Sequence, residues 1–265
     1  MARKNGIPKE RMEQIVRLLR EKDRLSVEDI CSEVGVSPIT ARRDLQDLEN
    51  IGLLRRTTGG AVPLEPLLYE PFRYDSTFQE QVERNAAEKR RIAVAASELV
   101  RDGETIACNA GTTTTQVIRC LRHRVDLKLK LVTNCVNIAM EVSQQEHLDV
   151  FLTGGHMRGD WFSLAGADAV ETMRHYFVDT LFLGVNGIDV EQGLTCFNPD
   201  ETILNAVMVE QAKRRILVAD HTKLSLIATH RICPVRAIHL LITDIGASDD
   251  AVAPYLDQGI EVRRV

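Results

Sequence analysis

The sequence has no uninterrupted apolar run of the roughly 18 residues that a transmembrane helix requires. Its first residues, MARKNGIPKERMEQ, lack the apolar segment that defines a secretory signal, so we expect neither a membrane-spanning nor a secreted protein. No two of its six cysteines are spaced as C-x-x-C, which argues against a zinc site or a disulfide framework. Scattered reduced thiols are typical of a cytoplasmic protein, and we expect neither a metal nor another cofactor.

Positive charge is also scarce over most of the chain, whose formal net charge is −5. Residues 1–60 hold 12 Lys and Arg against 10 Asp and Glu, a net charge of +2, whereas residues 61–265 hold 21 against 28, a net charge of −7. The acidic part would repel phosphate, so any contact with DNA is confined to the N-terminal part. The small positive excess predicts weak non-specific binding by a single copy.

The length and the apolar content of the chain, in contrast, are sufficient for folded domains. A chain of 265 residues with 44% apolar residues is long enough for two ordinary domains, each with a hydrophobic core, and is too apolar to be disordered. There is no internal repeat of fixed period and no low-complexity tract.

Three helices are predicted in the first fifty residues. Residues 9–22 place apolar side chains at helical spacing on one face. Ser26 lies three residues before Asp29, as in a capping box, and the helix that follows is expected to stop at Gly35. The third helix opens with Ser37 as a cap and Pro38 at the first helical position, where a missing N–H costs nothing.

The third helix and the segment after it carry the candidate DNA contacts. Gly52 is expected to end the helix, residues 53–57 to form a short strand, and Gly59 and Gly60 to form a tight turn. Two helices joined by a short turn, followed by a basic hairpin, are typical of a winged helix-turn-helix that places its second helix in the major groove. We expect DNA contacts from Ser37, Pro38, Thr40, Arg42, Arg43, Arg55, Arg56 and Thr58.

The remainder of the chain divides into a linker and a second domain. Residues 62–77 contain three prolines and no clean periodicity, which indicates a linker. We therefore expect a DNA-binding domain at residues 1–61, a linker at 62–77 and a second domain at 78–265, opening with a long helix from about Phe78 to Val100.

Short apolar runs then alternate with segments of helical period. This alternation predicts an α/β domain with a mainly parallel sheet covered on both faces, and ligands in such sheets lie outside the carboxyl ends of the strands. The expected strands are 105–108, 129–133, 150–153, 181–185, 216–219 and 240–243, and the expected helices are 113–121, 136–143, 165–176, 201–212 and 249–256.

The clearest ligand candidate is the segment 109–115, NAGTTTT, between a strand and a helix. Glycine allows a close approach of the backbone, and the helix start offers unpaired N–H groups and threonine hydroxyls to a phosphate. The pattern is not a P-loop, and an ordinary strand-to-helix turn capped by threonines is the alternative.

Other strand ends are rich in similar residues. Lys223 would supply positive charge to a phosphate, and Asp220 would accept a hydrogen bond from a sugar hydroxyl. The expected effector-binding residues are Asn109, Gly111, Thr112, Thr113, Thr114, Thr133, Asn134, Gly154, Gly155, Asn186, Asp220 and Lys223. No catalytic residue is nominated.

The N-terminal pattern resembles the DeoR family of bacterial transcriptional regulators. Members show a V-S-x-x-T-[IV]-R-R-D-L core and a GGA at the wing, and here residues 36–45 read VSPITARRDL and residues 59–61 read GGA. Ala41 replaces the usual Ile or Val, and Thr58 replaces a frequent His. Asp44 of this core is expected to be a structural partner of an arginine or of the backbone.

The second domain resembles the sensor domain of the same family, so the resemblance covers nearly the whole chain. It implies a fold similar to ribose-5-phosphate isomerase and glucosamine-6-phosphate deaminase, and a phosphorylated sugar as effector. Residues 179–201 look most like the amino-sugar branch. The positions that match the motifs of the family's sensor domain are Gly111 to Thr113, Thr133 and Asn134, Gly154 and Gly155, Ser163 and Gly166, and Asp220 to Lys223.

Together these features predict a DNA-binding regulator, a repressor of a carbohydrate-use operon. Its expected partners are a double-stranded DNA operator, a phosphorylated sugar and further copies of itself, as a dimer or tetramer. The alternative is a sugar-phosphate isomerase or deaminase with an appended DNA-binding module. Asn109 argues against that alternative, because the family often has Asp there and an amide cannot act as a base.

Overall fold

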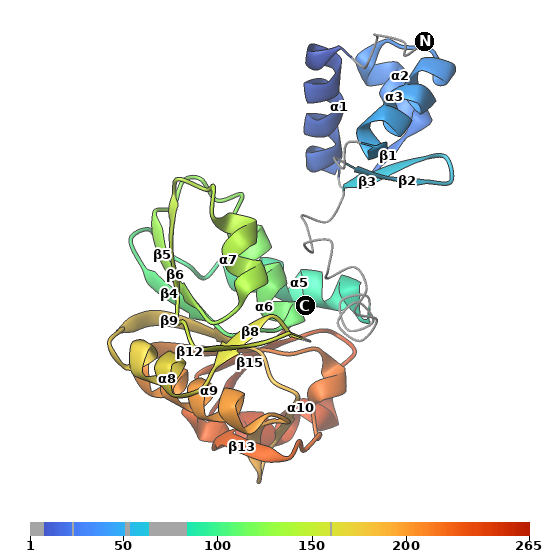
Figure 1. Cartoon of the computed structure of the whole chain (residues 1–265). Coiled ribbons are helices and arrows are strands. Elements are labelled where there is room, and N and C mark those ends of the chain that lie inside the picture. Colours follow the sequence, from blue (N-terminus) through green and yellow to red (C-terminus); the bar gives the residue numbers. More distant parts are fainter. Residues whose placement is uncertain (1–7, 23, 51–53, 64–83, 160) are drawn as a thin grey trace. The chain divides into compact units, whose positions relative to one another are not determined.

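A computed structural model describes residues 8–22, 24–50, 54–63, 84–159 and 161–265. The chain forms two compact units, residues 1–72 and 73–265 (Figure 1). Among the described residues, none of the helices combines the length and the apolar character needed to cross a bilayer.

The described residues of the N-terminal unit form three helices and a three-stranded antiparallel sheet of order β1-β3-β2. The three helices and the hairpin agree with the sequence-based expectation, and β1 is an addition of two residues. The elements are α1 (Lys9–Lys22), β1 (Leu25–Ser26), α2 (Val27–Val34), α3 (Pro38–Asn50), β2 (Leu54–Thr57) and β3 (Gly60–Pro63).

Local capping sets the boundaries of α2. The Asp29 amide donates to Ser26 Oγ (3.0 Å), and the Ser26 amide donates to Asp29 Oδ2 (2.8 Å), which is the expected capping box. Gly35 ends the helix in the left-handed conformation with φ of 71°, a conformation that costs glycine little. The apolar faces of the three helices meet in one buried core that includes Ile15 and Leu45.

The wing depends on a close backbone approach at Gly60. A Cβ atom there would lie 2.0 Å from the Leu25 carbonyl oxygen, so only glycine lets β3 pair with β1. Strand β3 continues to Pro63, opposite Leu54, and therefore includes the first two residues of the expected linker. The rest of that linker, the expected helix stop at Gly52 and the first residue of the expected strand 53–57 lie outside the described residues.

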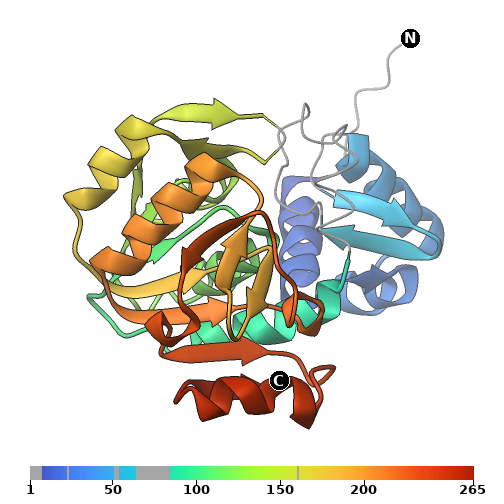
Figure 2. The same cartoon turned by 90° about the horizontal axis from the view of Figure 1, so that it is seen from below.

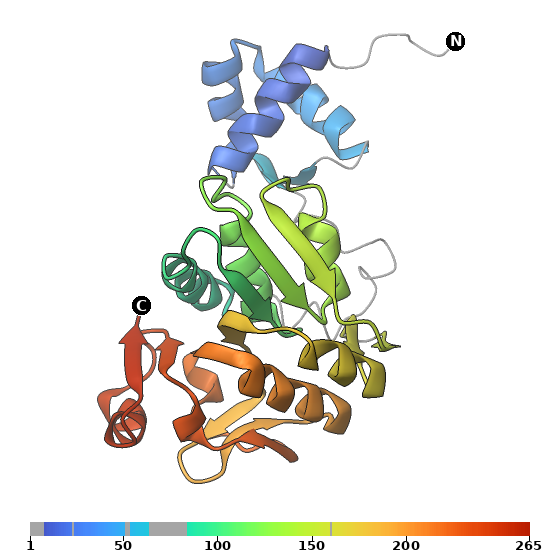
Figure 3. The same ribbon diagram turned by 90° about the vertical axis from the view of Figure 1, so that its left-hand side faces the viewer.

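The second unit is built on a seven-stranded parallel sheet of order β15-β14-β12-β9-β4-β5-β6. All six expected strands lie in it, and Figure 3 shows the green strands β4, β5 and β6 side by side. The added strand β15 lies at the edge and is rich in charge, so it lacks an apolar run. The strands are β4 (Thr105–Cys108), β5 (Leu129–Thr133), β6 (Leu148–Leu152), β9 (Val178–Leu183), β12 (Ala212–Val218), β14 (Leu240–Thr243) and β15 (Glu261–Arg264).

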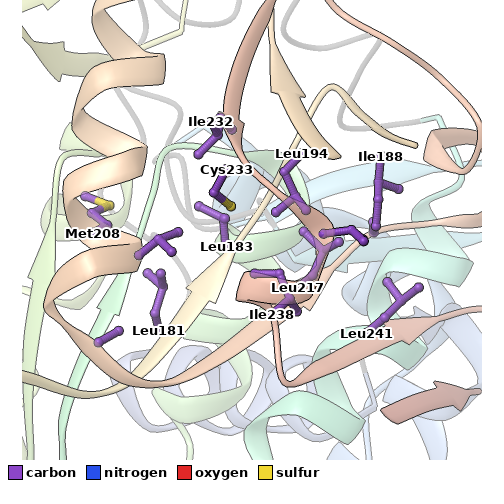
Figure 4. Packing of buried hydrophobic residues seen from close by; sticks show 14 of the residues in the cluster. Leu181, Leu183, Ile188, Leu194, Met208, Leu217, Ile232, Cys233, Ile238 and Leu241 are labelled. Atoms are coloured by element: carbon purple, nitrogen blue, oxygen red, sulfur yellow. The ribbon is translucent and has the colours of Figure 1, made fainter. Parts of the chain in front are cut away.

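Helices cover both faces of this sheet, as expected. Phe182 points into the core on one face, whereas Leu181 and Leu183 point into the core on the other, which explains why the strands read as continuous apolar runs. Figure 4 shows Leu181 and Leu183 packed with Met208 of α9. One face carries α5 (Ala86–Ser97), α6 (Thr112–Leu121) and α7 (Val136–Val142), and the other carries α8 (Ala167–Arg174), α9 (Pro199–Gln211) and α10 (Asp249–Asp257).

Helix α5 is shorter than the expected helix 78–100. Asn85 adopts the left-handed conformation with φ of 54°, so the helix begins only at Ala86, and it ends at Ser97. Residues 78–83 of the expected helix lie outside the described residues.

The sequence did not indicate several strands of three or four residues, because none of them contains an apolar run longer than two residues. They form a hairpin of β7 (His156–Arg158) and β8 (Ser163–Ala165) and a small sheet of β10 (Gly187–Asp189), β11 (Gly193–Cys196) and β13 (His230–Cys233). The described part of this unit also contains two 3-10 helices, η2 (His221–Lys223) and η3 (Val235–Ala237). In Figure 2, α10 (dark red) lies beside the edge of the sheet that ends in β15.

Candidate functional site

The start of α3 presents hydroxyl and guanidinium groups to solvent. Ser37, Pro38, Arg42 and Arg43 are exposed, and Thr40 is half-buried. Ser37 Oγ accepts a hydrogen bond from the Thr40 amide (3.2 Å), so Ser37 caps the helix as expected. No carboxylate among the described residues pairs with Arg42 or Arg43, so both charges can reach a phosphate or a base edge.

The residues of the wing differ in their contacts with the rest of the DNA-binding unit. Arg55 on β2 and Thr58 in the turn are exposed. The Arg56 amide donates to Glu49 Oε1 (2.9 Å), and the Arg56 guanidinium contacts Gln46 Oε1. Arg56 therefore links the wing to α3, whereas Arg55 and Thr58 point away from the unit.

A buried ion pair fixes the position of α3. Asp44 is 2% exposed, and its two carboxylate oxygens lie 3.0 Å from Arg11 Nη2 and 2.7 Å from Arg11 Nε. This two-point contact joins α1 to α3. The sequence predicted a structural arginine partner for Asp44, and the structure identifies it as Arg11.

The sequence reading missed Ile39, whose side chain is 77% exposed and therefore takes no part in the core.

In the second unit, the strand order reverses beside β4. The chain proceeds from β4 to β5 and β6 on one side, and then returns to β9 on the other side. Ligands in open parallel sheets bind at such a reversal, outside the carboxyl ends of the strands. The loop that follows β4 and the loop that follows β9 are therefore the natural walls of a site.

Asn109 joins these two loops. Its Nδ2 donates to the Gly184 carbonyl oxygen (2.9 Å), and its Oδ1 accepts from the Gly184 amide (2.8 Å). The Asn109 side chain is 3% exposed, and both ends of its amide are engaged with one residue. Asn109 therefore sets the spacing of the two strand ends.

The threonines after Asn109 have different partners. Thr114 Oγ1 donates to the Asn109 carbonyl oxygen (2.8 Å), and Thr115 Oγ1 donates to the Gly111 carbonyl oxygen (2.8 Å), so both shape the loop itself. Thr112 is half-buried and Thr113 is buried, and their hydroxyls have no hydrogen-bond partner in the part of the chain that the structure describes. Gly111 is extended, with φ of −179°.

The end of β5 is tied to the same loop. Asn134 Oδ1 accepts from the Ala110 amide (2.9 Å), and Asn134 Nδ2 donates to the Leu164 carbonyl oxygen (2.9 Å). Thr133 Oγ1 accepts from the Cys135 amide (3.1 Å). Both predicted residues are buried and hold neighbouring loops in place.

The ends of β6 and β9 bring further predicted residues to this edge. Gly154 and Gly155 are exposed and have positive φ, and a Cβ on Gly155 would lie 2.5 Å from the Ala165 carbonyl oxygen. Glycine therefore lets the loop pack closely against β8. Asn186 Oδ1 accepts from the Phe197 amide (3.2 Å).

The end of β12 carries the charged pair of the prediction. Asp220 is 2% exposed, and its Oδ1 accepts hydrogen bonds from Asn85 Nδ2 (3.1 Å) and from the amide and hydroxyl of Thr222. Lys223 is half-buried, and no carboxylate among the described residues lies within ion-pair distance of it. Asp220 is therefore engaged within the protein, whereas the half-buried Lys223 is not committed to such a pair among the described residues.

The structure has a second group of polar side chains around Glu201, which the sequence analysis did not predict. Glu201 Oε1 accepts from Ser163 Oγ and lies 2.9 Å from Arg158 Nη1, and Cys196 Sγ lies 3.7 Å from Glu201 Oε2. These contacts fasten the first turn of α9 to the β7–β8 hairpin. Only the tertiary structure reveals them, because Arg158 belongs to a strand that the sequence pattern did not indicate.

The side chains at this edge offer hydrogen-bond donors and acceptors rather than nucleophiles. Burial raises the pKa of the Cys108 thiol to about 12 and that of Cys135 to about 11, so neither is a nucleophile near neutral pH. Among the described residues, no three His, Cys, Asp or Glu side chains are grouped as metal ligands. The start of α6, Thr112, Thr113 and Lys223 remain as donors for a phosphate.

Comparisons with known proteins match both units. The family model for the DeoR C terminal sensor domain matches residues 84–245, and the model for the DeoR-like helix-turn-helix domain matches residues 11–66. A putative aga operon transcriptional repressor of Escherichia coli O157:H7 is 34% identical over 253 residues, covering 96% of this chain and 92% of that protein. The HTH-type transcriptional regulator GlpR of Haloferax volcanii is 38% identical over 256 residues, covering 97% of each.

Among solved structures, ribose 5-phosphate isomerase A from Methanocaldococcus jannaschii aligns with a TM-score of 0.39. The alignment has 21% identity and covers 52% of this chain and 54% of that chain.

Proposed function

This chain belongs to the DeoR family of transcriptional regulators, and from that premise we propose that it represses a carbohydrate-use operon under the control of a phosphorylated sugar. The family resemblance and the α/β fold expected from the sequence are confirmed. The chain is a DNA-binding transcriptional regulator with a sensor domain, and its N-terminal unit has the elements of a winged helix-turn-helix. It acts where its operator lies, in the cytoplasm.

On the DNA side, α3 enters the major groove and the wing lies along the backbone. Arg42 and Arg43 provide the charges of the helix. At the wing, Arg55 provides a charge and Thr58 a hydroxyl group, and the exposed Ile39 provides an apolar contact for a thymine methyl group. One such module buries only about 600–1,000 Å². Useful affinity therefore requires two or more copies, so the protein acts as a dimer or tetramer.

For the sensor domain, the proposal rests on one observation, namely the hydrogen-bond donors that gather where the strand order reverses beside β4. Thr112 and Thr113 stand in the first turn of α6 with hydroxyls that have no partner among the described residues, and Lys223 offers a cation at the same edge. Asn109, Asn134 and Asp220 shape the site through their bonds to backbone and side chains. A sugar phosphate is the ligand that needs both an anion cradle and polar loop groups.

The alternative, an isomerase or deaminase, lacks a base in the expected place. The Asn109 amide is engaged at both ends by Gly184 and cannot accept a proton from a sugar carbon. We therefore propose that the protein binds its sugar phosphate without turning it over. Turnover of an amino-sugar or pentose phosphate that disappeared in an Asp220→Ala variant would contradict this proposal.

A gel-shift assay on the promoters of the neighbouring genes tests the proposal. We expect specific binding that one phosphorylated sugar changes by about 5–150-fold, the range of ordinary allosteric coupling. The panel starts with amino-sugar phosphates, because residues 179–201 indicate that branch. A Lys223→Met variant should bind DNA but lose the response. If no sugar phosphate altered DNA binding, the sensor part of the proposal would be wrong.

A further inference from the structure

Asn137, in the first turn of α7, has a buried side chain whose amide nitrogen makes no hydrogen bond. The residue is 8% exposed, and its Nδ2 atom has no partner in the part of the chain that the structure describes. A buried amide without a partner costs free energy, so folded proteins keep few of them. The sequence analysis did not single out Asn137, because one asparagine near a helix start carries no signal by itself.

Asn137 lies on the face of α7 that meets α6. Glu141 Oε1 of α7 lies 2.8 Å from Arg119 Nε of α6, which identifies that face. Asn137 precedes Glu141 by four residues, so it lies one turn closer to the start of the helix on the same face. Because the Cα–Cβ bonds of a helix tilt toward its N-terminus, the Asn137 side chain is directed toward the edge where the strands end.

The facing side of α6 carries Thr112 in its first turn. Thr112 precedes Arg119 by seven residues, or about two helical turns, so it shares the helix face of Arg119. Its hydroxyl has no hydrogen-bond partner among the described residues. Gly111, the residue before the helix, has no side chain that could cap it, so the first backbone amides of α6 lack a side-chain cap as well.

The loops that lead into the two helices are joined to each other. Asn134 Oδ1 accepts a hydrogen bond from the Ala110 amide (2.9 Å), which connects the end of β5 to the loop after β4. Asn137 follows Asn134 by three residues, and Thr112 follows Ala110 by two. Strands β4 and β5 are parallel neighbours in the sheet, so α6 and α7 begin side by side at the same edge.

The unpaired groups between these helix starts are hydrogen-bond donors. Asn137 Nδ2 carries two N–H donors, Thr112 has a hydroxyl, and the first turn of α6 offers backbone N–H groups. A phosphate dianion has only acceptors and is therefore complementary to such a set. Asn137 Nδ2 has no bond within the protein to break before it donates to an anion, so the new hydrogen bond is a net gain.

Resting on the proposed function, we propose that Asn137 is a phosphate-binding residue of the effector site, which donates its side-chain amide to a phosphate oxygen between the starts of α6 and α7. Neither the sequence pattern nor the family comparisons assign this role to Asn137. The assignment extends the site from the strand ends to the first turn of α7.

Calorimetric titration of the full chain with inorganic phosphate tests this assignment. Asn137→Leu keeps the approximate size of the side chain but removes its donors. It should weaken phosphate binding by about 10-fold or more, which corresponds to the loss of one charge-assisted hydrogen bond. Asn137→Asp replaces the donor by a carboxylate that repels the dianion, and it should weaken binding at least as much.

Melting temperatures of the same variants separate a binding role from a structural role. Leucine has no polar atom to leave unpaired, so Asn137→Leu should melt no lower than the parent without phosphate. It should gain less than the parent when phosphate is added. Asn205→Leu is the matched control, because Asn205 is buried on α9, on the opposite face of the sheet, and this variant should bind phosphate as the parent does.

The contrary results have distinct meanings. If the parent binds phosphate and both Asn137 variants bind it equally well, the role of Asn137 is overturned and the proposed function stands. A loss of binding shared by Asn205→Leu would show a general effect on the fold and would also overturn that role. If the parent binds neither inorganic phosphate nor any phosphorylated sugar, the proposed sensor function fails together with this assignment. If Asn137→Leu does not fold, Asn137→Ala makes the same comparison without filling the space.

Discussion

Individual arginines of the DNA-binding unit are distinguished by their partners. Arg11 is committed to the buried Asp44, and Arg56 contacts Gln46, whereas Arg42 and Arg43 are exposed without a carboxylate partner among the described residues. The sequence pattern nominated Arg42, Arg43 and Arg56 alike as DNA contacts and did not single out Arg11. Of these four, we propose that Arg42 and Arg43 contact DNA directly.

Substitution of this pair should separate base contact from phosphate contact. We expect one of Arg42→Ala and Arg43→Ala to cost about 1–3 kcal/mol and to relax specificity at one operator position. The other should lower the slope of log K against log salt by about 1 and leave specificity intact. Binding titrations at several salt concentrations, with single-base operator variants, measure both effects. Parental binding by both variants would show that α3 is not the reading helix.

Lys89, in the first turn of α5, is buried and should make stability depend on pH. Its pKa is about 8 in the folded protein against an ordinary 10.5, so below pH 8 the buried charge opposes folding by at most about 3 kcal/mol. Between pH 8 and 10.5 the unfolded chain binds more protons than the folded one, so this penalty fades as pH rises.

Lys89→Met removes the penalty at every pH. The variant should therefore be more stable than the parent at pH 7, with a difference that shrinks towards pH 10. Denaturant unfolding followed by the fluorescence of Trp161, the one tryptophan, reports on the sensor unit. A difference that did not change with pH would show that Lys89 is not a depressed, buried cation.

At the scale of elements, the wing depends on glycine at one crossing. A Cβ on Gly60 would lie 2.0 Å from the Leu25 carbonyl oxygen, which belongs to backbone and cannot rotate away. We expect Gly60→Ala to break the pairing of β1 with β3, to destabilise the DNA-binding unit by about 1–3 kcal/mol or more, and to abolish operator binding.

Thermal unfolding and gel shifts measure this effect. Thr58→Ala, in the exposed turn of the same wing, is the matched control and should leave the melting temperature unchanged. If Gly60→Ala melted with the parent, the close approach between β1 and β3 would be wrong.

Periodicity predicted the long elements well and the short ones poorly. All six expected strands and all five expected alternating helices are present, because runs buried on both faces leave a strong apolar signal. The strands β7, β8, β10, β11 and β13 span three or four residues each and contain no apolar run longer than two residues, so they leave no such signal. Helix α5 begins later than expected because of Asn85. The Asn85 side chain makes no capping hydrogen bond to α5 and donates to Asp220 instead.

At the scale of the whole molecule, the charge distribution leads us to expect that several copies act together. An excess of +2 in the first sixty residues on an acidic body supports only weak binding by one copy. We expect at least a dimer in sedimentation experiments and an operator with half-sites about 34 Å apart, or a multiple of that distance.

Operator spacing tests this arrangement. An insertion of about 5 bp between the half-sites should turn one of them to the opposite side of the duplex and weaken binding strongly, and about 10 bp should restore part of it. Equal affinity for all three spacings would mean that each module binds independently.

The sequence alone determined what is local. Helix caps, the helix-turn-helix pattern, the alternation of strands and helices, and the glycine- and threonine-rich strand ends all depend on neighbours a few residues apart. They were enough to identify the fold class, the family and the edge of the sheet that holds the candidate site.

Tertiary structure alone decided what each polar side chain does at that edge. Asn109 meets Gly184 across 75 positions, and Asn85 meets Asp220 across 135, because the strand order brings these segments together. Predicted ligand residues such as Asn109 and Asn134 are thereby engaged within the protein, and an unremarked lysine, Lys89, is buried beside Asp220. Sequence spacing carries no record of such partners, since the order of strands in the sheet creates them.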